Sequence, residues 1–470
     1  MRFSPPGRRA ERRGLRLWHV WIVLPLTFTA ALAIAAGVFL AGWDLLSVRG
    51  LKPEHRIDSS TLFDLVKLSF GVVAGAGGLV ALVVAYRRQR VDEDGALREA
   101  TRLHTERFTT AVSQLGEESA AVRLGGVHAL AGLADDAPTR ELRQTCIDVL
   151  CAYLRLPYTA ESALPADDTD ARHAYLALRE VRHTIIRLIG NHLRLPLLNP
   201  RSWQGHDFDF TGVVFDGGNF IGAQFSGGTV SFRGAQFSDG TVNFYGAEFS
   251  DSLVDFIGAQ FSGGEVVFNR AQFSDRAIVF TGAQFSGSTV SFRGAQFSGG
   301  TVSFHETEFS DGTVSFGEAR FSGGEVVFNR ARFSGGEADF FGADFSDGTV
   351  SLREAQFSGG LVVFNRAQFS GGKVVFSGAE LSDGTISFRE AQFSDGTVDF
   401  ARVPFSGGTV TFRDAVFSDR MVNFDQAWFS GGTVDFSGAM GVPPSGLVPP
   451  SGVPLPAGLS LPTAWYDPAA

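Results

Sequence analysis

Several common residue types are scarce in this sequence. Only two of its 470 residues are cysteine, and only three of its 40 basic residues are lysine. Cys146 and Cys151 cannot supply a disulfide framework, and so small a number indicates a reducing compartment. The excess of arginine over lysine, together with abundant glycine and alanine, is typical of proteins from high-GC bacterial genomes.

Positive charge is scarce in the second half of the chain. Residues 201–440 contain 15 Lys and Arg against 28 Asp and Glu, a net charge of −13, whereas the other residues together carry +3. Contacts with nucleic-acid phosphates are therefore disfavoured, and no direct nucleic-acid partner is predicted. A hydrophobic content of 44% excludes a disordered chain, and 45 Phe against 6 Tyr and 6 Trp indicate a repeat.

Residue patterns that carry out catalysis are missing as well. The two cysteines are five residues apart, a spacing that separates them on a helix and disfavours a metal pair. The middle histidines show no i, i+4 spacing and are predicted to be surface or core residues: His104, His128, His173, His183 and His192. No serine of the repeat lies in a G-x-S-x-G context, and no phosphate-binding loop follows a strand. The sequence therefore predicts no catalytic, cofactor-binding or metal-ligating residue, and an enzyme is the least supported class.

Two uncharged stretches near the N-terminus are long enough to cross a membrane. Leu17–Trp43 has 27 residues and Leu68–Tyr86 has 19, and a helix rising about 1.5 Å per residue needs roughly 20 to span the hydrocarbon core. Six arginines precede the first stretch, and five follow the second within sixteen residues. This charge distribution predicts two transmembrane helices, both termini in the cytoplasm and a short outside loop at 44–67. The predicted location is the cell membrane, with lipid as the partner of both helices.

A cleaved signal peptide is the alternative for the first stretch, because Ala30 to Ala36 is rich in small residues. The stretch is too long for the apolar region of a signal peptide, and a second apolar stretch follows it. Even after cleavage, Leu68–Tyr86 and the arginines behind it would stop transfer. Everything after residue 87 is therefore predicted to be cytoplasmic in either case.

Small residues lie along one face of the second stretch, in Gly71-x-x-x-Gly75 and Ala74-x-x-x-Gly78. Such a face allows helices to approach closely, within a hairpin or between the subunits of a homodimer. The composition of a chain rich in Gly and Ala explains the pattern equally well, and both interpretations stay open.

The segment from Val91 to Leu195 shows the 3.6-residue periodicity of amphipathic helices. One helix is predicted after Pro138, with Asp135 and Asp136 as capping candidates and Pro157 beyond its end. Cys146 lies in its apolar stripe and is predicted to be a core residue.

A second helix of this segment has an apolar stripe from Tyr175 to Leu193 and stops before Pro196, and one or two more helices are predicted upstream. Ala121–Ala134 is similar to a single repeat unit of HEAT or armadillo type. Because one unit cannot make a solenoid, we predict a small juxtamembrane bundle.

A twelve-residue pattern fills the chain from Phe225 to Phe436. Its form is F-S-[GD]-G-[TE]-V-x-F-x-x-A-x, and it occurs in eighteen units. Leu381 replaces the first Phe of one unit, and Leu352 replaces the second Phe of another. A small residue precedes each Phe by two positions, so both side chains point to the same side of an extended segment, which we predict to be the interior.

The volume of these side chains decides how many residues form one coil of the solenoid. A twelve-residue coil would enclose two Phe, one Ala and one Val in a layer about 4.8 Å thick, and its walls would be too close for opposed rings. A coil of 24 residues has four sides with one Phe and one small residue on each. The sequence therefore predicts that Phe292 stacks on Phe268 and Phe316, with Phe304 on the facing wall.

Just upstream, Phe210, Phe215, Phe220 and Phe225 are spaced by five residues. Together with Gly222-Ala-Gln-Phe-Ser-Gly227 and Arg233-Gly-Ala-Gln-Phe-Ser238, this spacing resembles the A-[DN]-[LF]-x-x unit of the pentapeptide-repeat family. The resemblance covers roughly residues 208–440 and implies a right-handed, four-sided β-helix.

The repeat departs from the family in its spacing, because two extra residues enter alternate corners. We interpret it as a 12-residue double-pentapeptide variant with two enlarged corners, where Gly tolerates positive φ. With the predicted membrane helices, the chain looks like a membrane-anchored subgroup found in high-GC bacteria.

Four regions are thus predicted along the chain. They are a membrane anchor with two transmembrane helices (1–90), a cytoplasmic helical domain (91–205), the β-helix (206–440) and a Pro-rich tail (441–470). The tail contains eight prolines and is predicted to be extended or disordered, with Trp465 and Tyr466 as candidates for a cap.

Only the exterior of the β-helix is left for function, because Phe, Ala and Val account for its core and Ser and Gly for its corners. Acidic residues occupy some corners, and five arginines follow the second Phe of a unit: Arg233, Arg293, Arg353, Arg389 and Arg413. The first interpretation is a non-catalytic scaffold, tethered to the cytoplasmic face of the membrane, that binds an unknown protein on one face of the β-helix.

The exterior also suggests two other interpretations. The resemblance and the acidic charge imply a DNA-mimic regulator of a nucleic-acid enzyme such as a topoisomerase, but arginines interrupt that charge and a membrane tether keeps the chain from the nucleoid. An ice-binding threonine ladder would use Thr229, Thr241, Thr301 and their equivalents. Other residues break that ladder, namely Glu265, Glu325, Lys373 and Met421.

Overall fold

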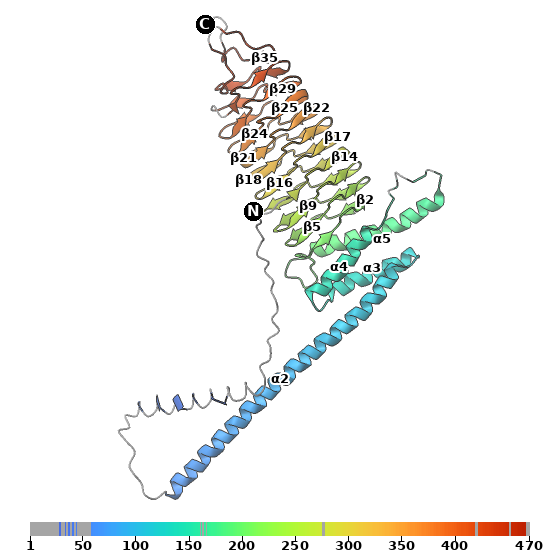
Figure 1. Ribbon diagram of the computed structural model, residues 1–470, viewed down its shortest axis with the longest axis vertical. Coiled ribbons are helices and arrows are strands. Elements are labelled where there is room, and N and C mark those ends of the chain that lie inside the picture. Colours follow the sequence, from blue (N-terminus) through green and yellow to red (C-terminus); the bar gives the residue numbers. More distant parts are fainter. Residues whose placement is uncertain are drawn as a thin grey trace. The chain divides into compact units, whose positions relative to one another are not determined.

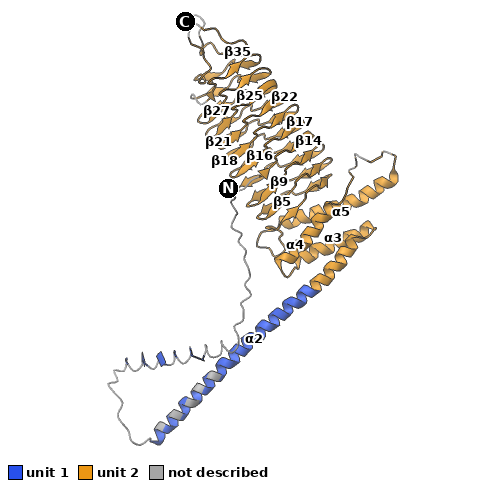
Figure 2. Ribbon diagram, viewed as in Figure 1, with its two compact units in different colours: residues 1–102 blue, residues 103–470 orange. Residues whose placement is uncertain are grey.

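The computed structural model describes residues 58–470, apart from residues 160, 162, 163, 166, 275–277, 419–421, 451, 452 and 467–470, together with isolated positions between 28 and 44. The chain forms two compact units, residues 1–102 and 103–470 (Figure 2). The first predicted membrane stretch, Leu17–Trp43, lies outside the described residues except at a few isolated positions.

A single long helix makes up most of what is described of the first unit. α2 (Ser59–Leu115) begins after Asp58, whose carboxylate accepts a hydrogen bond from the Ser59 N–H at 2.8 Å. From Leu62 onward α2 is long and apolar enough to cross a membrane, and it is the one such helix within the described residues. The expected pair of membrane helices is thus reduced to one candidate, which contains the predicted stretch Leu68–Tyr86.

α2 does not end with the arginines behind Tyr86, as the predicted boundary at residue 90 suggested. Residues 91–115 are rich in Ala, Leu, Glu and Arg, which have high helix propensity, and contain no proline. An i, i+3 ion pair joins Arg102 to Glu99 at 2.7 Å. The same helix therefore continues into the second unit, to which its residues 103–115 belong.

Three more helices follow in the described part of the second unit: α3 (Ala120–Asp135), α4 (Arg140–Leu154) and α5 (Thr169–Leu193). Thr139 caps α4 by accepting a hydrogen bond from the Leu142 N–H at 3.3 Å. The predicted caps were wrong, because a cap must directly precede the first turn, whereas Asp135 and Asp136 lie at the end of α3.

The helices of the second unit share one apolar core with the end of α2. Its fully buried members include Val127, Leu130, Ile147 and Ile185. Cys146 is 0% exposed, as its place in the apolar stripe predicted. Gly126 allows α3 to approach α2, because a Cβ there would lie 2.7 Å from the backbone nitrogen of Leu115.

A β-solenoid of about ten turns follows the helices (Figure 1). Its described strands pair in parallel in two sheets of 18 and 17 strands. The first sheet contains β1 (Phe208–Asp209), β4 (Gln224–Ser226), β5 (Thr229–Ser231), β8 (Glu248–Ser250), β9 (Leu253–Asp255), β12 (Gln272–Ser274), β13 (Ile278–Val279), β15 (Gln296–Phe297), β16 (Thr301–Ser303), β18 (Arg320–Val327), β21 (Asp344–Ser351), β23 (Gln368–Phe369), β24 (Lys373–Val375), β26 (Gln392–Phe393), β27 (Thr397–Asp399), β30 (Val416–Phe417), β31 (Val422–Asn423) and β34 (Met440–Gly441). The second contains β2 (Val214–Phe215), β3 (Gly218–Asn219), β6 (Gln236–Phe237), β7 (Thr241–Asn243), β10 (Gln260–Phe261), β11 (Glu265–Val267), β14 (Gln284–Ser291), β17 (Glu308–Ser315), β19 (Arg332–Phe333), β20 (Glu337–Asp339), β22 (Gln356–Val363), β25 (Glu380–Ser387), β28 (Pro404–Phe405), β29 (Thr409–Thr411), β32 (Trp428–Phe429), β33 (Thr433–Asp435) and β35 (Leu459–Ser460).

Successive units of the repeat alternate between the two sheets, so paired residues lie 24 positions apart. Phe261 pairs with Phe285, for example. The first coil is two residues shorter, since Phe215 pairs with Phe237. The shorter coil follows from the five-residue spacing of the upstream Phe residues.

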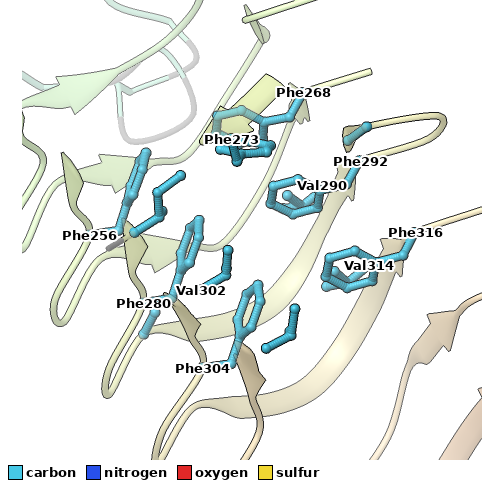
Figure 3. Packing of buried hydrophobic residues seen from close by; sticks show 14 of the residues in the cluster. Phe256, Phe268, Phe273, Phe280, Val290, Phe292, Val302, Phe304, Val314 and Phe316 are labelled. Atoms are coloured by element: carbon cyan, nitrogen blue, oxygen red, sulfur yellow. The ribbon is translucent and has the colours of Figure 1, made fainter. Parts of the chain in front are cut away.

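Four ladders of Phe rings fill the interior, one residue from each ladder in every coil. Phe292 lies 4.8 Å from Phe268 and 4.9 Å from Phe316 between ring centroids, with near-parallel planes. Phe304 meets Phe292 and Phe316 edge-on from a facing ladder (Figure 3). These contacts confirm the predicted 24-residue coil.

Both ends of the solenoid are covered by other parts of the second unit. α5 packs so closely on the first coil that a Cβ added to Gly190 would lie 2.5 Å from the Asn219 carbonyl oxygen. At the other end, the indole of Trp465 lies 5.7 Å from Phe436 and donates a hydrogen bond to the Gly441 carbonyl at 2.8 Å. Part of the Pro-rich tail therefore forms a cap on the last coil.

Candidate functional site

The exterior arginines singled out from the sequence are all exposed. Three of them reach a carboxylate about one coil further along: Arg233 to Asp255, Arg293 to Glu318 and Arg413 to Asp435, at 2.6–3.2 Å. Ion pairs at the surface, where the arginine is exposed to solvent, contribute about 1 kcal/mol or less each. The arginines are therefore distributed along the surface and do not form one cluster.

The threonine positions do not form a continuous ladder. Because successive units alternate between sheets, Thr229 pairs with Leu253 and Thr241 with Glu265. Other residues thus interrupt the threonines in both sheets, although Thr289 pairs with Thr313 and Thr409 with Thr433 in the second sheet. Met421, another expected interruption, lies outside the described residues.

Two kinds of corner join the strands of each coil. At the corner F-S-[GD]-G, which we call the wider corner, a Gly has positive φ in most units, for example Gly240 (φ 67). At the tighter corner, F-x-x-A, the Ala331 N–H donates to the Phe328 carbonyl at 3.0 Å and Arg330 has φ 58. This left-handed region is unfavourable for residues other than Gly, and the repeat pattern did not predict such residues there.

Ten described tight corners carry a residue other than Gly at this left-handed position. Nine of the ten are charged at neutral pH, and the tenth is a glutamine: Arg270, Glu306, Glu318, Arg330, Glu354, Arg366, Glu390, Arg402, Asp414 and Gln426. Stacking of coils brings them together in columns. Arg330 forms an ion pair with Glu354 at 2.8 Å, and Arg366 forms one with Glu390 at 2.7 Å.

One such column borders a groove on the solenoid, which we call the charged groove. Its volume is about 530 Å³, and its walls are two parallel columns of side chains: Glu306, Arg330, Glu354 and Gly378 in one, and Glu308, Arg332, Gln356 and Glu380 in the other. One basic row, Arg330 and Arg332, therefore lies between acidic rows of the groove, and Gly378 contributes no side chain to its row.

The basic row of the charged groove is only partly neutralised by its neighbours. Arg330 approaches Glu306 at 3.9 Å and Glu354 at 2.8 Å, and all three side chains are more than half exposed. Arg332 is exposed on β19 and takes part in no ion pair with the described residues. The groove can therefore offer a cation between two acidic rows to a partner of complementary charge.

A polar cluster around a buried carboxylate lies where α5 meets the first coil. The Asp216 carboxylate is almost fully buried and accepts four hydrogen bonds, from the Tyr158 hydroxyl (2.5 Å), the Tyr175 hydroxyl (2.9 Å), Arg179 Nε (3.1 Å) and His183 Nε2 (2.9 Å). Burial alone would raise the pKa of Asp216, but the hydrogen bonds from His183 and the tyrosines hold it well below its usual range. Burial and Asp216 raise the pKa of Tyr175 to about 12.

This Asp216 cluster fixes the helices to the solenoid and was not anticipated from the sequence. A signal was present, because Phe215-Asp216-Gly217-Gly218 carries Asp where the repeat has Ser. His183, predicted to be a surface or core residue, is a member of the cluster.

The other predicted histidines and cysteines lie apart from this cluster. His128 and His173 are exposed, and His192 stacks on Trp203 with ring centroids 4.1 Å apart. His104 is buried with its Nε2 3.8 Å from Cys146 Sγ. Burial raises the pKa of Cys146 to about 11 and that of Cys151 to about 12, which makes both thiols unreactive. Among the residues that the structure describes, no three His, Cys, Asp or Glu side chains are placed to hold a metal ion.

Comparison with known families finds a match within the solenoid. Residues 280–332 and 364–416 match a family model described as pentapeptide repeats (9 copies). These two segments of the solenoid are similar to pentapeptide repeats. Proteins built of these repeats are generally non-catalytic, and their solenoids are typical of protein-interaction scaffolds. Searches among curated proteins and among solved structures give no match.

Proposed function

We propose that this pentapeptide-repeat chain is a membrane-tethered, cytoplasmic scaffold that binds a protein partner on the exterior of its solenoid and catalyses no reaction. The observation that carries the proposal is the division of side chains: the repeated apolar residues are buried, while charged residues gather in ordered columns outside. A basic row between acidic rows favours a folded partner with complementary charge over a small substrate.

We also propose that each coil is right-handed and four-sided and contains two 12-residue double-pentapeptide units. The four Phe ladders and the two kinds of corner support this cross-section. By this interpretation the wider corners hold the two extra residues of each unit. The charged groove then runs along one tight corner.

The membrane tether rests on α2 and on the predicted first stretch. Between Leu62 and Tyr86, large apolar side chains of α2 are exposed, including Leu68, Phe70 and Leu82. Exposed apolar surface of this extent is costly in water and favourable in lipid. The flanking arginines favour a cytoplasmic location for both termini, as in the membrane-anchored type found in high-GC bacteria.

A reporter fusion tests this topology. An enzyme reporter joined after residue 470 should be active only in its cytoplasmic form, and a cysteine placed at Leu51 should react with an impermeant reagent from outside. Periplasmic activity of the C-terminal fusion would overturn the proposed orientation.

The acidic charge of residues 201–440 supports a second candidate function, that of a DNA-mimic regulator of a nucleic-acid enzyme. Against it, Arg330 and Arg332 form a cationic row inside the charged groove. A surface that imitates the phosphates of DNA would be expected to carry negative charge without such a row.

Charge reversal in the groove tests the scaffold function. Proximity labelling from membranes should detect a partner of the wild type that is lost from the double variant Arg330→Glu, Arg332→Glu. The matched control is Arg320→Glu, Arg366→Glu, which changes the equivalent positions along the other tight corner and should keep the partner. If the wild type and both double variants label the same set of neighbouring proteins, the charged groove is not the binding surface. Recovery of a topoisomerase or another nucleic-acid enzyme would favour the second function.

A further inference from the structure

A small cavity lies among the helix ends of the second unit, away from the charged groove. Its volume is about 250 Å³. Two arginines, Arg123 and Arg182, line it together with apolar side chains of Leu115, Leu156 and Leu178. The cavity thus combines two cations with an apolar wall.

Arg182 is a buried cation without a carboxylate partner among the described residues. It is 2% exposed, and its two terminal nitrogens donate to the carbonyl oxygens of Leu154 and Val214, each at 2.7 Å. Its guanidinium lies 4.0 Å from the ring centroid of Tyr158, while its Nε is buried with no hydrogen-bond acceptor within the described structure. The Asp216 carboxylate, which influences it electrostatically, is already occupied by four other donors.

Arg123 reaches the same cavity from the first turn of α3. Its terminal nitrogens donate to the Tyr153 hydroxyl at 3.3 Å and to the Glu118 carbonyl oxygen at 3.1 Å. Its Nε is also buried and has no acceptor in the described part of the chain. Two buried N–H donors on two cations are therefore unsatisfied around one cavity, an arrangement that native proteins seldom leave without a ligand or water.

Glu117 is the one carboxylate that lines the cavity. It is exposed and forms no hydrogen bond or ion pair with either arginine. Even with Glu117 counted, the lining has an excess of positive charge. The planar guanidinium group pairs best with carboxylate or phosphate oxygens.

We propose that this cavity binds a small organic anion, whose carboxylate or phosphate group lies between Arg123 and Arg182 and whose short apolar body packs against Leu115, Leu156 and Leu178. The proposal does not depend on the scaffold function. It places a ligand among the ends of α2, α3 and α4, at contacts that also hold the solenoid through Val214.

Calorimetric titration of the full-length protein in a non-ionic detergent tests the proposal. Butanoate and butyl phosphate are the probes, and 1-butanol and inorganic phosphate are the controls for charge and for the apolar body. At least one organic anion should bind saturably with one site per chain, and more tightly than either control. The stronger of the two anions identifies the head group.

Substitutions then locate the site. Arg123→Gln should weaken binding about tenfold, because it removes a charge-assisted contact, while Glu117→Gln should leave binding intact or strengthen it. Arg172→Gln, at an exposed arginine paired with Glu161, is the control and should bind as the wild type does. Arg123→Lys, which keeps the charge but loses the planar fork, should also bind more weakly and serves if the Gln variant does not fold. The proposal is overturned if neither organic anion binds to the wild type, or if binding is unchanged in the folded Arg123 variants.

Discussion

Most buried Phe side chains of the solenoid pack between two equivalent rings of the neighbouring coils. Phe316 is 0% exposed and lies 4.9 Å from Phe292 and 4.8 Å from Phe340. Phe316→Asp would bury a carboxylate without a partner and should open the solenoid at this coil to limited proteolysis. Ser310→Asp, at a half-exposed corner, should leave the protease pattern unchanged. Equal sensitivity of the two variants would mean that Phe316 does not face inward.

Leucine is a milder replacement at the same position. Leu352 and Leu381 already occupy equivalent places in two of the ladders and are buried there. Phe316→Leu should therefore lower the free energy of unfolding by less than about 2 kcal/mol. Thermal unfolding of Phe316→Asp, Phe316→Leu and Ser310→Asp measures the order of their stabilities.

The Asp216 cluster predicts a pH dependence of stability. Because the pKa of Asp216 is lowered in the folded chain, its stabilisation is complete well above the ordinary value of 3.8 and is lost as the pH falls below it, where the unfolded chain takes up the proton first. Asp216→Asn should cost about 3 kcal/mol at neutral pH and reduce the loss of stability in acid. Urea unfolding between about pH 3 and 7 measures both effects.

Asp311→Asn provides the control for Asp216, because Asp311 is exposed at a corner. This variant should follow the wild type at every pH. An Asp216→Asn variant with the acid dependence of the wild type would show that Asp216 does not hold α5 to the solenoid.

At the scale of single elements, strand register can be tested by cross-linking. Ser291 of β14 and Ser315 of β17 are partners in adjacent coils, whereas Ser303 belongs to β16 of the other sheet. Cysteines at 291 and 315 should form a disulfide under oxidation, since paired strands lie about 4.8 Å apart. Cysteines at 291 and 303 should not. The opposite result would make the coil twelve residues long.

How far an element could be predicted depended on whether its signal was local. Small-x-Phe spacing and side-chain volume were sufficient for the 24-residue register of β14 with β17, because the repeat supplies the same evidence many times. The cap of α4 was missed, since the exact first residue of a helix decides between Thr139 and Asp136. The contacts of Asp216 with α5 were missed for another reason, because they depend on how helices dock onto the first coil, which no periodicity encodes.

At the scale of the whole molecule, deletion of one twelve-residue unit tests how the units beyond it are placed in the solenoid. Deleting residues 298–309 should leave a folded solenoid that is half a coil shorter, because each unit contributes an equivalent set of buried residues. Every strand beyond the deletion then moves to the other sheet. A cysteine at Val327 should therefore cross-link to one at 291 in the deletion variant only, and the 291–315 pair should no longer form. Retention of the 291–315 cross-link would show that the coils had not moved.

The two covered ends of the solenoid also bear on how such a chain is inherited. α5 closes one end and Trp465 the other, while the near-identical units between them can be duplicated or lost by recombination without altering either end. An odd number of units gained or lost would turn the whole distal surface to the opposite side, and a partner bound there would be lost with it. Descendants that keep a working surface should therefore differ in length by multiples of 24 residues, so that selection acts on whole coils although the gene can change by half of one.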